Sequence, residues 1–123
     1  MAEPLCPYDK YENFRDIQKD LPEDKKLDVI IDLLFDLPDL NRSTIIYLAR
    51  FFRDVTTHPE NLMNTYNIAV IITPNIFRVQ TMTVKDMMNH GTLTDVFSLI
   101  MKNVEHVIER LRSRDTDPNS LIN

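Results

Sequence analysis

Apolar residues recur at helical spacing along most of the chain, and prolines separate the recurring segments. Pro7 opens the first segment, which runs to Asp20, and Pro22 lies near the start of the second. Their apolar positions are Tyr8, Tyr11, Phe14 and Ile17 in the first, and Leu27, Ile30, Ile31 and Leu34 in the second. Side chains three and four residues apart share one face of an α-helix. Both segments are therefore predicted to be helices with one buried face.

Two further helices are predicted in the middle of the chain. Pro38 is expected to stop the second helix and Asn41 to cap the third, because asparagine is a favoured N-cap. The apolar stripe of the third helix is Ile45, Leu48, Ala49, Phe52 and Val55. Thr65 is expected to cap the fourth helix and Pro74 to end it. The run from Ile68 to Ile72 is predicted to be buried all round, which would make this the central core helix.

The carboxy-terminal third of the chain carries the longest periodic pattern. A short turn is expected at Val84 to Met88, followed by one long helix that begins near Thr92. The stripe of that helix is Leu93, Val96, Phe97, Ile100, Val104, Val107, Ile108 and Leu111. No strand-like alternation competes with these patterns, so we predict an all-α bundle of about five helices. The expected organisation is one helical domain at residues 2–112 and a polar tail at residues 113–123.

Composition restricts the possible functions. The chain has 123 residues, 43% hydrophobic and 27% charged, which is typical of one globular domain. A net charge of −5 argues against nucleic-acid binding, and a single glycine, Gly91, argues against Walker-type and Rossmann-type nucleotide sites. No run approaches the roughly 20 apolar residues of a bilayer span, and the start has no signal-peptide pattern. A lone Cys6 indicates a reducing compartment, so we expect a cytoplasmic protein.

A search for catalytic groups finds no positive support for an enzyme. The three histidines show no partner arrangement in the sequence, and the spacing of His106 and Glu109 is typical of a surface contact. We therefore expect no metal and no cofactor. The acidic row on the second helix is Asp24, Asp28, Asp32 and Asp36. It is interpreted as a solvated surface, with a recognition patch as the alternative.

Three ordered blocks of residues resemble the RhoGAP domain, the GTPase-activating domain for Rho-family GTPases. The first block resembles Pro-Glu-Pro-Leu-Ile-Pro-x-x-x-Tyr-x-x-Phe, on Glu3, Pro4, Leu5, Pro7, Tyr11 and Phe14. The second resembles Leu-Pro-x-x-Asn-x-x-Thr, on Leu37, Pro38, Asn41 and Thr44. The third resembles Asn-x-Met-x-x-x-Asn-Leu-Ala-x-x-x-x-Pro, on Asn61, Met63, Asn67, Ala69 and Pro74, with Asn75 following. The resemblance covers the chain to about Leu111 and identifies it as the carboxy-terminal portion of such a domain, without its amino-terminal helices.

The resemblance implies a partner and a binding surface. The partner would be a Rho-family small GTPase, of the Rho, Rac or Cdc42 type. The positions matching the family's GTPase-contacting groove are Asn67 and Val70, with Pro74 and Asn75 as rim positions. Ile72-Thr73 departs from the family's Phe-Gly.

The chain also departs from the family in its catalytic machinery. RhoGAP domains insert an arginine from a Gly-x-x-Arg-x-Ser-Gly-like loop into the GTPase, and such a finger is worth about 10³ to 10⁵ in rate. No such loop occurs here, and Arg78 matches a helix-end position. We therefore expect no catalytic residue in this chain and a regulator of GTPase signal transduction that does not stimulate hydrolysis by itself.

Three hypotheses remain open from the sequence. The chain is a module that docks a GTPase without activating it, or a fragment of a longer and active RhoGAP protein, or a helical adaptor for a non-GTPase partner. Helices taken from a bundle leave the core faces that they covered exposed to water. We therefore expect the chain by itself to be marginally stable, to self-associate, or to pair with a missing amino-terminal segment.

Overall fold

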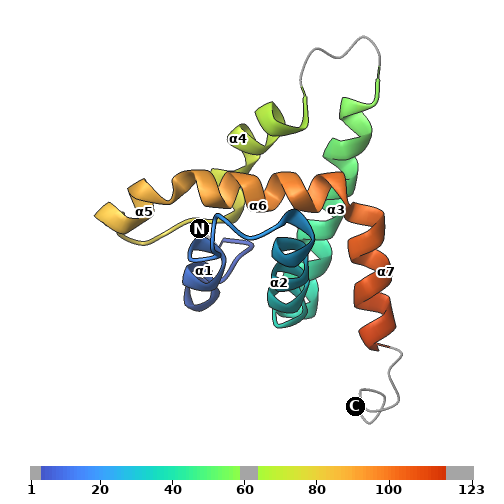
Figure 1. Cartoon of the computed structure of the whole chain (residues 1–123), viewed down its shortest axis with the longest axis horizontal. Helices are drawn as coiled ribbons and strands as arrows, with labels where there is room; N and C mark the ends of the chain where they lie inside the picture. Colours follow the sequence, from blue (N-terminus) through green and yellow to red (C-terminus); the bar gives the residue numbers. More distant parts are fainter. Residues whose placement is uncertain (1–3, 59–63, 116–123) are drawn as a thin grey trace.

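The computed structural model describes residues 4–58 and 64–115, and within these ranges it consists of α-helices without strands (Figure 1). The seven helices are α1 (Tyr8–Arg15), α2 (Glu23–Phe35), α3 (Asp39–Thr56), α4 (Thr65–Ile76), α5 (Val84–Met88), α6 (His90–Lys102) and α7 (Val104–Asp115). The predicted all-α class is confirmed. The described residues form seven helices where about five were expected, because the turn expected at Val84 to Met88 is the short helix α5 and the last expected helix divides in two. The expected tail begins at residue 113, inside α7, and the division into residues 2–112 and 113–123 stays a prediction.

The first two helices form as their apolar spacing predicts. Pro7 and Pro22 are the N-cap residues, where the fixed φ of proline suits the start of a helix and its missing N–H costs nothing. The buried face of α2 is the predicted one: Leu27, Ile30, Ile31 and Leu34. Helix α1 ends at Arg15, not near Asp20, although Ile17 beyond its end is still buried.

The N-cap prediction for α3 is wrong. Pro38 occupies that position with extended backbone, at φ −55° and ψ 146°, and Asn41 lies within the first turn. The Asn41 side chain donates instead to the carbonyl of Leu5, at 2.9 Å. The backbone N–H of the next residue, Cys6, donates to the carbonyl of Ile76 at 3.0 Å. These two bonds tie the segment before α1 to both α3 and α4.

Helix α6 is the central helix of the fold, and the assignment of that role to the fourth predicted helix is wrong. It contacts each of the other six described helices, and Figure 1 shows it crossing the molecule with the others arranged around it. Its buried residues are Thr92, Leu93, Thr94, Val96, Phe97, Ser98, Leu99, Ile100 and Met101. Burial on nearly all sides is expected for a helix that every neighbour packs against.

The single long helix predicted from Thr92 to Leu111 is wrong, because the chain bends at Asn103. This residue has φ −118° and ψ 25°, outside helical values, and its side-chain amide donates to the carbonyl of Leu99 at 3.0 Å. The apolar spacing continues through the bend, so periodicity alone hides it. Helix α7 turns away from α6 and packs on α2 and α3.

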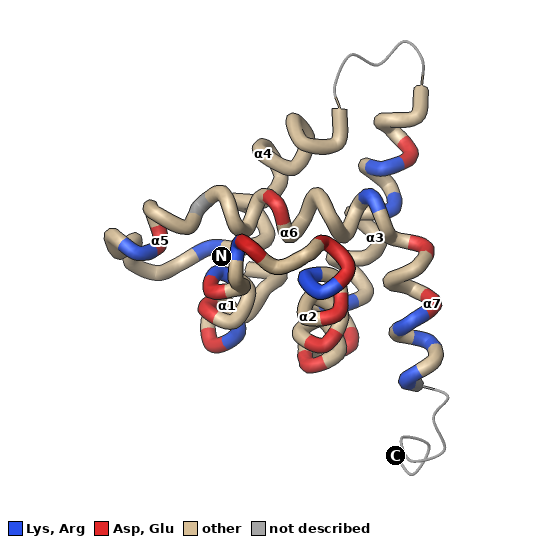
Figure 2. Tube along the Cα trace, viewed as in Figure 1, with Lys and Arg blue, Asp and Glu red and all other residues tan. Residues whose placement is uncertain are grey.

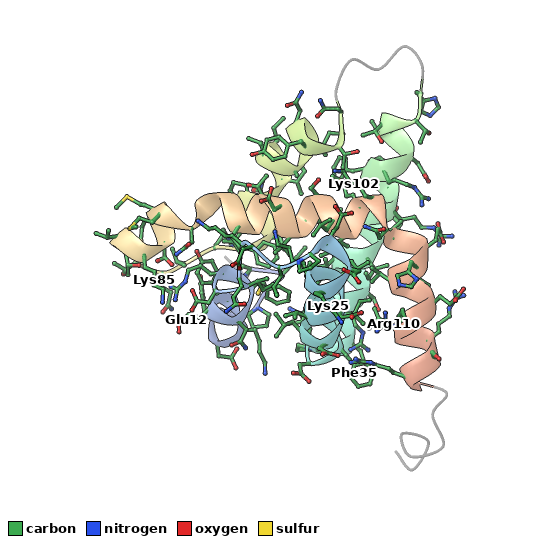
Figure 3. The ribbon with its side chains drawn as sticks, in the orientation of Figure 1. Glu12, Lys25, Phe35, Lys85, Lys102 and Arg110 are labelled. Carbon is green, nitrogen blue, oxygen red and sulfur yellow. The ribbon has the colours of Figure 1, made fainter. Side chains whose placement is uncertain are left out.

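Ion pairs link α7 to two neighbouring helices. Arg110, labelled on α7 in Figure 3, pairs with Asp28 at 3.1 Å, and Arg114 pairs with Asp32. Both aspartates lie on α2. Glu105 pairs with Arg53 of α3 at 3.0 Å. Asp28 and Asp32, in the middle of the acidic row, therefore also pair with α7. Their side chains are still 49% and 61% exposed, so the interpretation of the row as a solvated surface is not contradicted. Its outer members are exposed.

None of the described helices is both long and apolar enough to cross a membrane.

Candidate functional site

The candidate site begins at the first turn of α4, which is capped by Asn64. This residue has extended backbone, and its side-chain oxygen accepts a hydrogen bond from the backbone N–H of Asn67 at 2.8 Å. Thr65 is the first residue inside the helix, so the prediction that Thr65 is the cap is wrong. The N-cap must have non-helical backbone with its side chain reaching the third helical residue. In this chain Asn64 meets that requirement.

Helix α4 has one buried side and one exposed side. The buried residues are Ile68, Ala69, Thr73 and Ile76, which face a helix pair made by α3 and α6. The four predicted contact residues are all exposed: Asn67, Val70, Pro74 and Asn75. Positions 67, 70 and 74 follow the spacing that places side chains on one helix face, and position 75 adjoins them. The structure thus brings the four predicted residues together.

The prediction that the run Ile68 to Ile72 is buried all round is wrong. Val70 is 44% exposed and Ile71 is 57% exposed. Only one side of α4 packs on the bundle, so the apolar side chains on its other side remain at the surface. Exposed apolar patches of this kind are typical of interaction sites. We call the exposed residues Tyr66, Asn67, Val70, Ile71, Pro74 and Asn75 the α4 face.

Two members of the α4 face, Tyr66 and Ile71, were missed from the sequence. Tyr66 is 50% exposed and is the one titratable side chain of α4. Ile71 lies one turn after Asn67, and this spacing is the signal that could have placed it beside the predicted residues. Because Ile71 is apolar, it was instead counted among the residues expected to form the core.

Pro74 does not end α4, contrary to prediction. The helix runs on to Ile76, and the N–H of Phe77 still donates to the carbonyl of Thr73 at 2.9 Å. Proline is tolerated here because it interrupts only the last turn. It has no N–H to donate to the carbonyl of Val70, while the Asn75 side chain donates to the carbonyl of Ile71 at 3.2 Å. The α4 face therefore combines apolar side chains with amide groups.

Thr73 is fully buried beneath this face, at the position where the family pattern has glycine. Its hydroxyl has no hydrogen-bond partner within the described part of the chain. A buried, unpaired hydroxyl costs about 1 to 3 kcal/mol. The departure from the family pattern is therefore a local destabilising feature beneath the α4 face.

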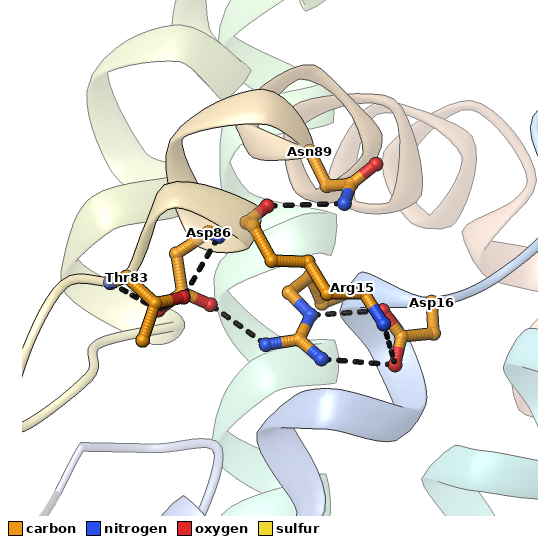
Figure 4. Close-up of polar contacts among 6 residues, drawn as sticks. Arg15, Asp16, Thr83, Asp86 and Asn89 are labelled. Carbon is orange, nitrogen blue, oxygen red and sulfur yellow. Dashed lines mark hydrogen bonds and ion pairs between the residues drawn. The ribbon is translucent and has the colours of Figure 1, made fainter.

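A second polar cluster joins α1 to α5, centred on the buried residues Arg15 and Asp86 (Figure 4). The Arg15 guanidinium contacts Asp86 at 2.9 Å through Nη1 and Asp16 at 2.8 Å through Nε. The other oxygen of Asp86 accepts from the backbone N–H and the hydroxyl of Thr83, both at 2.9 Å. In return the Thr83 hydroxyl accepts from the N–H of Asp86 at 3.1 Å, which completes a capping box for α5.

Hydrogen bonds and burial shift the pKa values in this cluster. The backbone N–H of Thr83, followed by the side chain of Arg15, lowers the pKa of Asp86 to about 2. Burial, followed by the charge of Asp86, raises the pKa of Tyr11 to about 12. The cluster therefore holds a charged pair at neutral pH, with Arg15 fully engaged inside the fold. We interpret it as a structural clamp between α1 and α5.

Cys6 is a buried free thiol, as an ordinary core side chain would be. Burial, followed by the charge of Asp9, raises the pKa of Cys6 to about 12. Reactive cysteines need an accessible thiolate, so this residue is not suited to nucleophilic chemistry. No group of three or more His, Cys, Asp or Glu residues in the described ranges is arranged to hold a metal ion.

Comparison with known proteins gives the family. A family profile described as the RhoGAP domain matches residues 1–81, more than half of the chain. The chain belongs to the RhoGAP domain family. The matched residues include α1 to α4 and the whole α4 face.

Curated relatives of this RhoGAP domain chain are Rho GTPase-activating proteins. Rho GTPase-activating protein 42 of Danio rerio is 29% identical over 120 residues, which is 97% of this chain and 14% of that protein. Rho GTPase-activating protein 7 of Mus musculus is 35% identical over 83 residues, which is 67% of this chain and 8% of that protein. The chain thus spans a small part of the length of these relatives.

Solved structures confirm the fold. The BH domain of GRAF, the GTPase regulator associated with focal adhesion kinase, superposes with a TM-score of 0.78 at 22% identity, covering 88% of this chain and 58% of that one. Human Rho GTPase activating protein 15 superposes with a TM-score of 0.76, covering 85% of this chain and 50% of that one. Residues 1–81 make up much less than 88% of the chain, so the structural similarity extends beyond the profile match into the last two helices.

Proposed function

We propose that this chain is a regulatory module that docks a Rho-family GTPase on the α4 face and does not accelerate GTP hydrolysis by itself. The observation that carries the proposal is the exposure of Asn67, Val70, Pro74 and Asn75 together on one side of α4. These are the positions that match the contact groove of the RhoGAP family. Apolar side chains on a folded surface favour burial by a partner, at about 25 cal/mol for each Å² removed from water.

The chemistry of the α4 face determines how a GTPase would be held. Val70 and Ile71 supply apolar area, while Asn67 and Asn75 offer amide groups at two edges of it. The Asn67 side chain makes no hydrogen bond within the described residues, so its amide is available to a partner. With Tyr66 as the one titratable group on α4, binding would depend little on salt concentration.

The contacts of the arginines support the proposal that the chain does not stimulate GTP hydrolysis. Six of them bind acidic side chains within the described fold: Arg15, Arg42, Arg50, Arg53, Arg110 and Arg114. An arginine finger needs an extended loop that reaches the phosphates of the GTPase, and Gly91, the one glycine, lies inside α6. We therefore assign the chain a regulatory role, with no catalytic residue of its own. Separately, we propose that it lies in the cytoplasm.

The exposed apolar side chains also favour a further partner. Helix α3 exposes Leu40 and Tyr47, at 78% and 67%. Exposed apolar side chains that gather on one helix face favour contact with a partner, so we include self-association or pairing with an amino-terminal segment in this proposal. The same exposure favours the second candidate function, a helical adaptor for a non-GTPase partner.

A paired assay tests the proposal. GTP hydrolysis by purified Rho-family GTPases is followed with and without the chain, and retention of the same GTPases loaded with GDP and aluminium fluoride is measured on the immobilised chain. We expect retention without acceleration, and we expect Asn67→Ala to reduce retention because it removes the free amide. Thr57→Ala, at the exposed C-cap of α3, is the matched control and should retain the GTPase as the wild type does.

The possible outcomes separate the candidate functions. Faster GTP hydrolysis in the presence of the chain would contradict the proposal that the chain supplies no arginine finger. Absence of retention, with the chain shown to be folded by circular dichroism, would contradict GTPase docking and favour the adaptor.

A further inference from the structure

Pro74 leaves one backbone carbonyl of α4 without its helical donor. In an α-helix the carbonyl of each residue accepts from the N–H four positions later, and for Val70 that position is Pro74. Proline has no N–H, and its ring crowds the carbonyl four residues before it. No side chain in the described parts of the chain donates to the Val70 carbonyl in its place. This carbonyl is therefore an acceptor that the fold leaves to solvent.

The Val70 carbonyl lies on the exposed side of α4. A helical carbonyl points along the helix axis toward the residue four positions later, so this one lies between Val70 and Pro74. Both residues are exposed, Val70 at 44%. Carbonyls on the solvent side of a helix also tilt outward toward water. The free acceptor is therefore part of the α4 face.

Two neighbouring carbonyls of α4 have donors inside the fold. The side-chain amide of Asn75 donates to the carbonyl of Ile71 at 3.2 Å. The backbone N–H of Phe77 donates to the carbonyl of Thr73 at 2.9 Å. The Val70 carbonyl differs from both, because the residue that should supply its donor is a proline.

No charged side chain of α4 competes with this carbonyl. Figure 2 shows α4 without lysine, arginine, aspartate or glutamate along its length. The acceptors of the α4 face are therefore neutral: the Val70 carbonyl, the Tyr66 hydroxyl and the amide oxygens of Asn67 and Asn75. The carbonyl belongs to the backbone and cannot rotate away as a side chain can. Its place on the α4 face is fixed before a partner binds.

A partner that covers the α4 face would remove the water that satisfies this carbonyl. Val70 and Ile71 make the middle of the face apolar, so close contact there excludes water. A backbone acceptor that loses water without gaining a protein donor opposes binding, and nearly all buried carbonyls in proteins are hydrogen-bonded. The Val70 carbonyl therefore favours partners that bring a donor to this point.

We propose that the protein docked on the α4 face donates a hydrogen bond from an N–H group to the Val70 carbonyl, and that Pro74 keeps this acceptor free. The inference rests on the proposed docking of a Rho-family GTPase at this face, and it names the chemistry that selects the partner. Of two partners with equal apolar contact, the one with an N–H at this point binds more tightly. Pro74 then acts through the carbonyl of Val70, in addition to any contact of its ring.

The substitution Pro74→Ala tests the role of the free carbonyl. Alanine restores an N–H that donates to the Val70 carbonyl, so the acceptor is occupied before the partner arrives. The new amide at position 74 should be protected from hydrogen exchange. We expect the affinity for a Rho-family GTPase loaded with GDP and aluminium fluoride to fall about threefold to tenfold, the usual effect of one hydrogen bond. Pro22→Ala, at the exposed N-cap of α2, is the matched control and should leave the affinity unchanged.

Carbonyl NMR separates this hydrogen bond from a contact with the proline ring. The isotopically labelled wild-type chain is measured with and without the GTPase, and the Val70 carbonyl is detected through the amide of Ile71. We expect the Val70 carbonyl resonance to move downfield in the complex, as it does when a carbonyl gains a donor. The Ile71 carbonyl already has the Asn75 amide as a donor, so it is the internal control and should move less.

The outcomes separate this inference from the proposed function. A loss of affinity in Pro74→Ala without movement of the Val70 carbonyl resonance would assign the effect to the proline ring and overturn the inference. An unchanged affinity in Pro74→Ala, while Val70→Asp still weakens binding, would overturn the inference and leave the docking site in place. A folded wild-type chain that retains no GTPase would overturn both.

Discussion

Asp86 is the one buried carboxylate among the described residues. It is 3% exposed, and it binds Arg15 through one oxygen and Thr83 through the other. Removing one partner of a buried ion pair leaves the other partner charged and unpaired, which costs more than the pair itself contributes. The clamp between α1 and α5 therefore depends on both members.

We predict that Asp86→Asn lowers the free energy of unfolding by about 3 kcal/mol, because Arg15 stays buried without its charged partner. Urea denaturation measures the loss. Asp16→Asn is the control: Asp16 also binds Arg15, but its side chain is 40% exposed and its loss should cost under about 1 kcal/mol. Equal losses in the two variants would contradict the clamp.

Acid should weaken the same clamp. The pKa of Asp86 is about 2 in the folded chain, below its ordinary value of 3.8. Because the folded pKa is the lower one, the contribution of Asp86 to stability is complete above about pH 4 and is lost as the pH falls toward 2. Unfolding measured across this range should show a steeper pH dependence for the wild type than for Asp86→Asn. An identical pH dependence of stability in the wild type and in Asp86→Asn would contradict the lowered pKa of Asp86.

At the scale of helices, the sequence predicts buried faces well where only one side of a helix is apolar. The four buried residues of α2 were predicted because charged residues occupy its other side. Helix α4 has no charged side chain, so spacing could not show that Val70 and Ile71 face outward. The exposed side is decided by where α3 and α6 pack, and a local pattern does not contain that information.

Helix ends were predicted less well, for a local reason. Several residues near each end can serve as a cap, and the backbone selects one of them. Pro38 took the position expected for Asn41, which instead binds the carbonyl of Leu5, a partner 36 residues away in sequence. The bend at Asn103 was hidden because apolar residues continue at helical spacing on both sides of it.

The cap of α4 can be tested by a pair of alanine variants. Asn64→Ala should lower the free energy of unfolding by about 1 kcal/mol, because the N–H of Asn67 loses its acceptor. Thr65→Ala should cost little, since Thr65 lies inside the helix and makes no capping bond. Thermal denaturation compares the two. A larger loss of unfolding free energy for Thr65→Ala than for Asn64→Ala would identify Thr65 as the cap.

At the scale of the whole molecule, family and fold class were both predictable from the sequence. Ordered motif residues such as Pro38, Asn41 and Pro74 identified a RhoGAP domain, and the profile match over residues 1–81 bears this out. The central role of α6 was not predictable, since it arises from contacts with six other helices. The α4 face was placed by resemblance to the family, and its docking role stays a prediction.

The apolar surface on α3 and α4 should limit the stability of the chain by itself. Every 100 Å² of apolar surface left in water forgoes about 2.5 kcal/mol, against a typical net stability of 5 to 15 kcal/mol. We expect a low melting temperature that rises with protein concentration or on addition of a partner segment. Calorimetry with sedimentation tests this. A monomer with a cooperative melt at high temperature would contradict it.

The central claim, that the α4 face binds a Rho-family GTPase, is tested most directly by the effect of one substitution on affinity. The dissociation constant for a GTPase loaded with GDP and aluminium fluoride is measured by titration for the wild-type chain, Val70→Asp and the control Met87→Asp. Both positions are apolar and exposed, at 44% and 59%. We predict that Val70→Asp weakens binding by tenfold or more, about 1.4 kcal/mol, while Met87→Asp has no effect. Equal affinities for Val70→Asp and the wild type would contradict the claim.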